Sequence, residues 1–214
     1  MRREVLEMLR LQADVNSKID PAWLQARYPY MRAVLVETTE AMDHHGWKWW
    51  SKQTMNLEQL RIELIDIWHF ALSQLLLDHG GDLAKAADEV EASWGNSDVA
   101  DTLFDQPAPK NLLECLERMA GLAAFRQFSV PLFRRIMDDC GLSFEDLFRS
   151  YVAKNVLNHF RQDHGYKAGV YRKVWGGRED NEHLAEVVAG LREQPERLAA
   201  ALYVELDRRY TATA

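Results

Sequence analysis

The segment RIELIDIWHFALSQLLL, residues 61–77, constrains the fold more than any other part of the chain. Its apolar residues cover almost the whole circumference of a helix, which is typical of a helix buried on all sides. Two acids, Glu63 and Asp66, nevertheless lie within it. Because residues three apart share one face of a helix, both carboxylates point the same way. The segment therefore predicts a buried helix that carries a paired acidic site.

A second acidic pair, Glu37 and Glu40, has the same spacing in the apolar segment AVLVETTEAM. Burying an ionised carboxylate without a partner costs at least several kcal/mol, so these groups call for bound cations or paired bases. Ligand sets made only of oxygen favour Mg²⁺, Mn²⁺ or Ca²⁺ over softer metals. The two pairs together therefore indicate a site for hard divalent cations.

Helical periodicity runs through most of the chain and predicts an all-α, multi-helix bundle. A capping box at Ser143–Asp146 begins one further helix, and Gly165 ends it. No segment alternates convincingly at period two, so we expect no sheet. A basic, glycine-containing loop follows, from residue 166 to residue 181. The expected helices span residues 2–16, 31–45, 56–78, 82–92, 111–126, 129–140, 143–163 and 182–208, with a loop over 94–110.

The chain length and composition fit one soluble domain over residues 1–214, in which residues 82–142 are the least characteristic part. Two cysteines, Cys115 and Cys140, do not make a disulfide scaffold, and the N-terminus lacks the apolar run of a signal peptide. We therefore expect a cytoplasmic protein. No stretch reaches the ~18–20 apolar residues of a membrane span, and the formal net charge of −7 argues against nucleic-acid binding.

Basic residues are concentrated between residues 151 and 178, where the only acid is Asp163. A basic island in an acidic protein is a candidate phosphate site, although a solvated helix face followed by an exposed loop would give the same pattern. The acidic pairs upstream favour the first reading, because metal-binding carboxylates and a basic tail are the two halves of a nucleotide site. The basic residues are Lys154, Arg161, Lys167, Arg172, Lys173 and Arg178.

Two further features allow more than one interpretation. The tryptophans at 47, 49 and 50 could be core residues, a dimer contact, or a stacking surface for a base. His69 follows Asp66 at three residues, as in half of a di-iron bundle site. The second half is missing, since the only other such spacing is Asp180/His183 near the C-terminus. A hydrogen-bonded core histidine is therefore the favoured interpretation of His69.

Three segments, ETTEAMDHHGWKWW, IELIDIWHF and KNVLNHFRQDHGYKAGVYRKVWGGREDN, resemble the dimeric, all-α dUTPase family. That family belongs to the wider all-α nucleoside triphosphate pyrophosphatases, which include the MazG-like enzymes. The resemblance covers Leu9 to about Asn181, and its third segment separates dUTPase-like from MazG-like proteins. It implies an all-α dUTPase-like domain, a homodimer, and the reaction of dUTP with water to give dUMP and diphosphate. It also implies cleavage of dUDP to dUMP and phosphate.

The resemblance implies roles for individual residues. Mg²⁺, or Mn²⁺ in its place, would be held by Glu37, Glu40, Glu63 and Asp66. Glu40, assisted by Glu37, would orient or deprotonate the metal-activated water that attacks the β-phosphorus. The phosphate-binding residues would be Lys154, Arg161, Tyr166, Lys167 and Lys173, and the base and sugar contacts would be Gln12, Asn16, Trp50 and Asn158.

Other functions remain open at the level of sequence. A broader or dCTP-preferring pyrophosphohydrolase of the same superfamily would differ by only a few amide contacts to the base. A helical interaction module would have no need of four buried carboxylates, and a di-iron bundle protein would need a second Glu-x-x-His on a helix.

Overall fold

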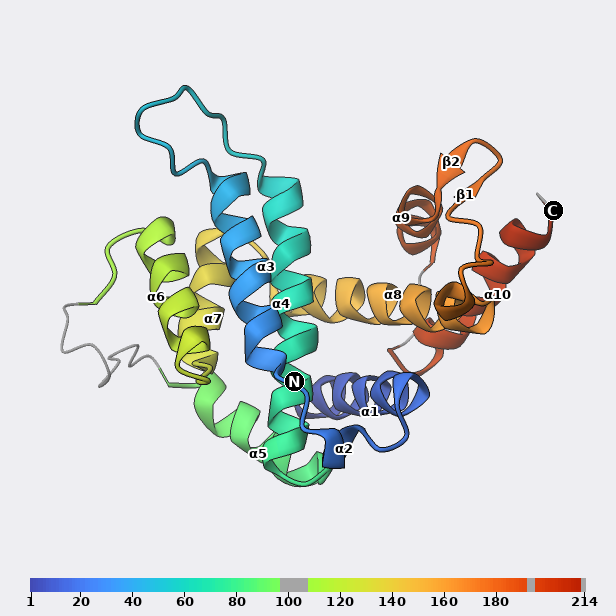
Figure 1. Ribbon diagram of the computed structural model, residues 1–214, viewed down its shortest axis with the longest axis horizontal. Helices are drawn as coiled ribbons and strands as arrows, with labels where there is room; N and C mark the ends of the chain where they lie inside the picture. Colours follow the sequence, from blue (N-terminus) through green and yellow to red (C-terminus); the bar gives the residue numbers. More distant parts are fainter. Residues whose placement is uncertain (97–107, 192–194, 213–214) are drawn as a thin grey trace.

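The computed structural model describes residues 1–96, 108–191 and 195–212, and these residues are largely helical (Figure 1). Ten α-helices lie in the described part of the chain, together with one 3₁₀ turn and two very short strands. The predicted all-α fold class is confirmed.

Helices α3 (Tyr30–His45) and α4 (Leu57–Asp78) form an antiparallel hairpin at the centre of the fold (Figure 1). Helix α3 ends at His45 and is followed by the capping residue Gly46, whose φ of 85° lies in the left-handed region that favours glycine. Helix α4 begins at Asn56, whose side chain accepts a hydrogen bond from the backbone of Gln59. As predicted, α4 is buried on nearly all sides. The connecting residues 46–56 project beyond the two helices.

Three helices cover one side of this hairpin. Helix α6 (Leu112–Ala124) packs against α3, while α7 (Val130–Asp139) lies against both α6 and α5 (Leu83–Trp94). The ring of Trp68 from α4 stacks on Phe133 from α7, with 5.0 Å between ring centroids. The part of the predicted loop at 97–107 lies outside the described residues.

Helices α1 (Arg2–Ile19) and α8 (Phe144–Asp163) run beside each other, across the direction of α4 (Figure 1). The hydroxyl of Tyr151 on α8 lies 3.0 Å from the carbonyl oxygen of Met8 on α1. The predicted capping box of Ser143 and Asp146 is present at the start of α8. Helix α1 continues three residues beyond the predicted end at Asn16, and the short helix α2 (Trp23–Ala26) follows it.

The C-terminal elements pack at the far end of α8 and correct two predictions. Strands β1 (Val174–Trp175) and β2 (Arg178–Glu179) form an antiparallel pair, although no sheet was expected. Strands of two residues are too short to produce a visible alternation. The single helix predicted over 182–208 was also wrong. It is two helices, α9 (Asp180–Gly190) and α10 (Pro195–Ala212), because proline cannot continue a helix from the preceding turn.

The remaining expectations concern cysteines and membranes. Cys115 and Cys140 are free and buried. Among the described residues, no helix combines the length and apolar character needed to cross a bilayer.

Candidate functional site

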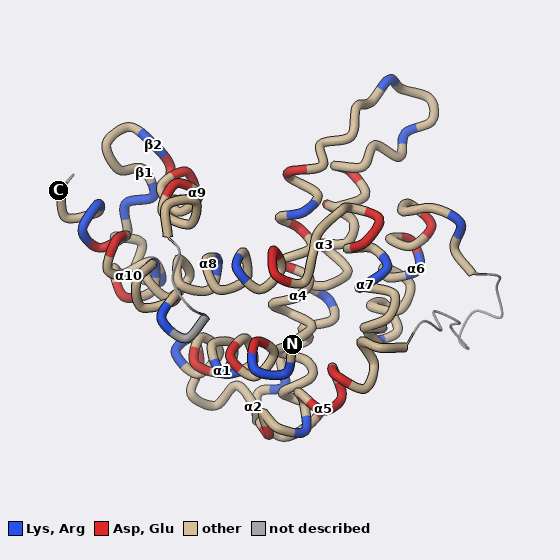
Figure 2. The backbone as a smooth tube through the Cα atoms, turned by 180° about the vertical axis from the view of Figure 1, so that it is seen from behind, with Lys and Arg blue, Asp and Glu red and all other residues tan. Residues whose placement is uncertain are grey.

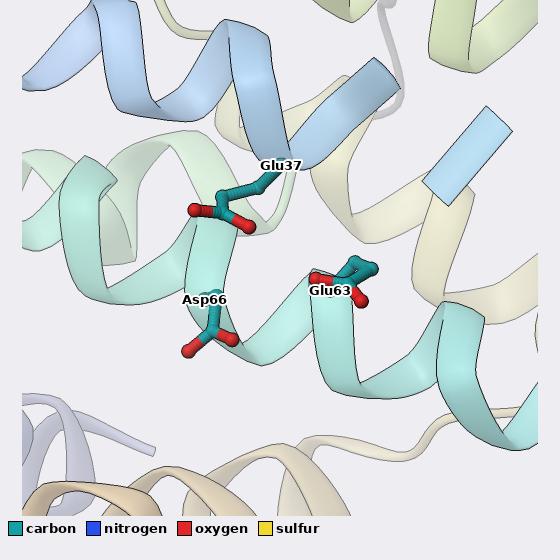
Figure 3. Close-up of side chains that lie close together, drawn as sticks. All are labelled: Glu37, Glu63 and Asp66. Atoms are coloured by element: carbon teal, nitrogen blue, oxygen red, sulfur yellow. The ribbon is translucent and has the colours of Figure 1, made fainter. Parts of the chain in front are cut away.

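Three of the four predicted carboxylates converge between α3 and α4. Glu37 comes from α3, while Glu63 and Asp66 come from one face of α4 (Figure 3). Their nearest oxygen atoms all lie within 4.8 Å of one another. Glu63 is buried, and the other two are half-buried. We call these three residues the carboxylate cluster.

Burial and mutual repulsion disfavour the ionised forms of the cluster. The pKa of Glu37 is raised to about 7, first by burial and then by the negative charges of Asp66, Glu40 and Glu63. The pKa of Glu63 is raised to about 6, again first by burial and then by Asp66. A divalent cation among these oxygens would reverse both effects, since it stabilises the ionised carboxylates. The oxygen-only donor set fits Mg²⁺ or Mn²⁺.

Two nitrogen groups lie against the cluster. The Nζ atom of Lys154, from α8, lies 3.0 Å from Oδ2 of Asp66. The Nε2 atom of His44, from the last turn of α3, lies 3.3 Å from Oε1 of Glu63. Lys154 is therefore positioned where a phosphate oxygen bound beside Asp66 would need a positive partner.

Glu40, the fourth predicted carboxylate, is not part of the cluster. It lies one turn beyond Glu37 on α3 and is exposed. Its charge nevertheless contributes to the raised pKa of both Glu37 and Glu63. It therefore lies at the solvent-facing edge of the cluster, within electrostatic reach of it.

A cavity of about 430 Å³ adjoins the cluster, and Asp66 belongs to its wall. The wall is built mainly from α1, α4 and α8. It includes five of the residues predicted to contact substrate, namely Gln12, Asn16, Asn158, Arg161 and Tyr166. One carboxylate of the cluster and most of the residues predicted to contact the base or sugar thus line the same cavity.

The cavity wall contains a chain of buried hydrogen bonds between α1 and α4. The amide nitrogen of Gln12 donates to Oδ1 of Asn16 over 3.1 Å, and the amide nitrogen of Asn16 donates to Oγ of Ser73 over 3.1 Å. The Tyr151 hydroxyl lies 2.7 Å from Oε1 of Gln12, and Nδ1 of His69 lies 2.9 Å from the same oxygen. These contacts hold the two amides in fixed orientations.

His69 is a cavity residue that the sequence interpretation placed only in the core. It is buried and hydrogen-bonded, as expected, and its ring stacks on Tyr151. Its pKa is lowered to about 3, first by burial and then by the charge of Lys154. Because Oε1 of Gln12 can only accept, Nδ1 of the neutral ring must donate, which leaves Nε2 as an acceptor. Nε2 is buried and has no partner among the described residues.

A helical pattern could have identified this side of the cavity. Asp66, His69 and Ser73 are three and four residues apart, so they share one face of α4 with the predicted acidic pair. Tyr28, from the segment before α3, and Tyr30, the first residue of α3, also line the cavity. Nothing in their spacing pointed to that position.

Lys154 contacts the carboxylate cluster and does not itself line the cavity, and three further predicted substrate residues do not line it either. Lys167 is exposed, with Nζ 3.4 Å from the carbonyl oxygen of Ile19 at the end of α1. Lys173 is exposed beside β1 and lies 3.4 Å from a carboxylate oxygen of Glu179.

The third, Trp50, is exposed on the 46–56 loop, where its ring packs edge-on against Trp47 and Trp49.

Figure 2 shows acidic residues on α3 and α4 and basic residues on α8 and around the β1–β2 hairpin. The two charged halves of the predicted site thus belong to different helices.

An acidic, cation-fitting cluster beside a cavity with amide and basic groups defines a helical nucleotide hydrolase. A family model described as dUTPase matches residues 4–166, which is most of the chain. The chain belongs to this all-α dUTPase family and is an enzyme that acts as a dUTP diphosphatase. No curated protein matches the chain. The family, fold and reaction predicted from the sequence are confirmed, and the family implies a divalent metal.

Proposed function

We propose that this enzyme hydrolyses dUTP to dUMP and diphosphate with Mg²⁺ held by Glu37, Glu63 and Asp66, and that it also cleaves dUDP. The observation that carries the proposal is the convergence of three carboxylates within 4.8 Å, one of which also forms the wall of the cavity. When bound there, Mg²⁺, or Mn²⁺ in its place, would neutralise phosphate charge and acidify the attacking water. The raised pKa values of Glu37 and Glu63 support a site that is completed by a cation.

We propose that Glu40 orients the attacking water and takes its proton. Its carboxylate is exposed beside the cluster, where water and substrate can reach it. Attack at the β-phosphorus then releases dUMP with its original oxygens, while the new oxygen enters the diphosphate. Glu37, one turn away, assists by holding the cation and by placing a negative charge beside Glu40.

The phosphate chain is held by basic and hydroxyl groups from α8 and the following turn. Lys154, Arg161 and Tyr166 are the proposed contacts supported by position, since the first touches the cluster and the others line the cavity. Lys167 and Lys173 remain proposed phosphate ligands, and Lys173 would reach the cavity by a movement of the β1–β2 hairpin. These groups neutralise charge and fix the phosphates in line with the water.

Uracil recognition is proposed to depend on the amides of the cavity wall and on His69. Gln12, Asn16 and Asn158 offer amide donors and acceptors to the base and sugar. The Nε2 acceptor of His69 matches the N3–H donor of uracil. Cytosine has a lone pair at N3, so it would bring two acceptors together and leave both unpaired. This supports dUTP over dCTP as the substrate.

We propose that the enzyme is a homodimer. The 46–56 loop exposes Trp49 at 89% and Trp50 at 58% of their surfaces, and Met55 of the same loop is also exposed. Large apolar groups gathered on one projecting loop are typical of a protein interface. Trp50 remains a proposed base or sugar contact, which a partner subunit or a movement of the loop would have to bring to a cavity.

We also propose that the enzyme works in the cytoplasm without a nucleic-acid partner. The two free, buried cysteines fit a reducing compartment. The net charge of −7 disfavours binding to a polyanion.

The test is Mg²⁺-dependent hydrolysis of dUTP, dUDP, dCTP, dTTP, UTP and ATP, with products separated by chromatography. We expect dUTP and dUDP to be cleaved far faster than the others. Reaction in ¹⁸O-labelled water should place the label in diphosphate, whereas label in dUMP would mean attack at the α-phosphorus. If dCTP is hydrolysed as fast as dUTP, the proposed cation site stands but the proposed role of His69 is wrong.

A further inference from the structure

The guanidinium of Arg161 is held from one side by a buried carboxylate. Its Nε donates to Oδ2 of Asp180 over 2.8 Å, and its Nη2 donates to Oδ1 over 2.9 Å. This two-point geometry fixes the plane of the guanidinium as well as its position. Arg161 has no other polar partner among the described residues, so three of its five N–H donors, two on Nη1 and one on Nη2, are not used within the fold.

Asp180 is itself fixed on several sides. Its side chain is completely buried, and the Tyr171 hydroxyl donates to its Oδ2 over 2.9 Å. Its backbone nitrogen donates to the carbonyl oxygen of Lys173 over 3.0 Å. It is the first residue of α9, directly after β2, so the hairpin and the helix both set its place. It also lies outside residues 4–166, which the family model matches.

The pairing determines what Arg161 can offer to the cavity. Burial alone lowers the pKa of Arg161, but the hydrogen bonds and charge of Asp180 more than offset this, and the net pKa is raised. Arg161 therefore stays charged although it is mostly buried. Asp180 takes one N–H from Nε and one from Nη2, so both N–H groups of Nη1 and the second N–H of Nη2 are left for a ligand in the cavity that Arg161 lines.

We propose that Asp180 is a positioning residue for phosphate binding, which acts by holding Arg161 with Nη1 directed at the substrate. This inference rests on the proposed role of Arg161 as a phosphate ligand. A side chain fixed before the substrate arrives loses little further freedom on binding, so the contact is stronger than one from a mobile arginine. Asp180 never touches the nucleotide.

A purely structural role for Asp180 makes a different prediction. Asp180 also links the C-terminal elements to α8, so its loss could loosen the fold without any preference for phosphate. Breaking a buried ion pair is strongly destabilising in general. The experiment must therefore separate phosphate-dependent binding from loss of structure.

The experiment compares Asp180→Asn, Arg161→Gln and the double variant, with Glu186→Gln as the control. Glu186 is also on α9 and pairs with Arg178 and Arg209, but it does not line the cavity. Steady-state kinetics with dUTP and calorimetric binding of deoxyuridine, which lacks phosphate, are measured for each protein. Hydrogen exchange over residues 171–180 reports whether the hairpin stays docked.

We expect Asp180→Asn to raise the KM for dUTP roughly tenfold or more, the size expected for one charge-assisted hydrogen bond. Deoxyuridine should bind as in the wild type, and Glu186→Gln should have no effect on either. The double variant should be no worse than Arg161→Gln, because Asp180 acts only through Arg161.

Other outcomes overturn the proposal in distinguishable ways. An unchanged KM in Arg161→Gln removes the proposed phosphate role of Arg161 and the inference with it. If the KM rises in Arg161→Gln but not in Asp180→Asn, the inference about Asp180 is wrong while the phosphate role of Arg161 stands. The same holds if the increases in KM of the two single variants multiply in the double variant. If Asp180→Asn does not fold, Tyr171→Phe is used. It should raise the KM by a smaller factor with deoxyuridine binding unchanged, and an unchanged KM overturns the proposal.

Discussion

Lys154 on α8 and Asp66 on α4 form an ion pair, with Nζ 3.0 Å from Oδ2, across a sequence separation of 88 residues. Asp66 belongs both to the carboxylate cluster and to the cavity wall. The pair therefore marks the point where the proposed metal half and the proposed phosphate half of the site meet. A cation at the cluster would compete with Lys154 for Asp66 and leave the ammonium group for a phosphate.

This competition makes the contribution of Lys154 to stability depend on metal. We expect Lys154→Met to lower the free energy of unfolding by about 1–2 kcal/mol in EDTA, a value between those of exposed and buried ion pairs. The loss should shrink in saturating Mg²⁺, because the cation then neutralises Asp66. Urea unfolding with and without Mg²⁺ measures both values. Lys52→Met, at an exposed lysine of the 46–56 loop, should show no such difference.

Neutralising Glu63 should have opposite effects on stability and turnover. Glu63 has a pKa raised to about 6, chiefly by burial and next by Asp66, so its charge is unfavourable in the metal-free fold. Glu63→Gln should therefore raise the free energy of unfolding in EDTA at neutral pH by about 1–2 kcal/mol. It should also abolish dUTP hydrolysis and the stabilisation by Mg²⁺. Glu58→Gln, at an exposed residue of the same helix, serves as the control, and metal-dependent turnover in Glu63→Gln would refute the proposed ligand set.

The base preference should change when the acceptor at His69 is replaced. A glutamine side chain can turn its NH₂ group toward the cavity and donate a hydrogen bond there. The unprotonated Nε2 of the neutral His69 ring can only accept one. We expect His69→Gln to raise the ratio of kcat/KM for dCTP to that for dUTP roughly tenfold or more. The same change at His79, which contacts Glu89 away from the cavity, should leave the ratio unaltered. An unaltered ratio in His69→Gln would mean that other groups read the base.

His69 also predicts a pH dependence of stability. Its folded-state pKa of about 3 lies below the ordinary value of 6.5 because of burial, so the unfolded chain binds the proton more readily. The stability linked to His69 is therefore complete above pH 6.5 and is lost as the pH falls toward 3, by about 1.4 kcal/mol per pH unit. Chemical unfolding at several pH values tests this, as the difference between wild type and His69→Gln. A difference that does not vary over this range would contradict it.

The exposed tryptophans should determine the oligomeric state. Trp49 is 89% exposed, so Trp49→Glu should leave the fold of one chain intact while placing a charge in the proposed interface. We expect sedimentation equilibrium to give a dimer for the wild type and a weakened dimer for the variant. Val204→Glu, at a residue of α10 that is 68% exposed, should leave the mass unchanged. If the wild type sediments as a monomer, the homodimer proposal is wrong.

The central hairpin and its acids could be predicted because the signals are local. Glu63 and Asp66 are three residues apart in a segment that is apolar on nearly every side, and that pattern fixes both the helix and the shared face. The capping box at Ser143 marked the start of α8 for the same reason, since both partners lie within one turn. The family resemblance then supplied Gln12, Asn16 and Asn158, which the structure brings to one cavity.

The parts that escaped prediction depend on contacts between distant segments. His69 lies on the same face of α4 as Asp66, but its place in the cavity wall depends on where α1 and α8 pass. The spacing of Asp180 to His183 does not reveal its pairing with Arg161, because Arg161 comes from another helix. The break between α9 and α10 was missed because residues on both sides keep a helical pattern, and the break is marked only by single residues, Gly190 at the end of α9 and Pro195 at the start of α10.

The two halves of the site also differ in when a growing chain could assemble them. The carboxylate cluster lies on two consecutive helices joined by one loop, so its contacts are local. The cavity instead needs Gln12 to meet Tyr151, across 139 residues. Chains leave the ribosome N-terminus first, and distant contacts form late. A nascent chain that ends before α8 thus has the carboxylates for a cation but lacks the cavity for a nucleoside. Nucleotide can therefore bind only after α8 has been synthesised.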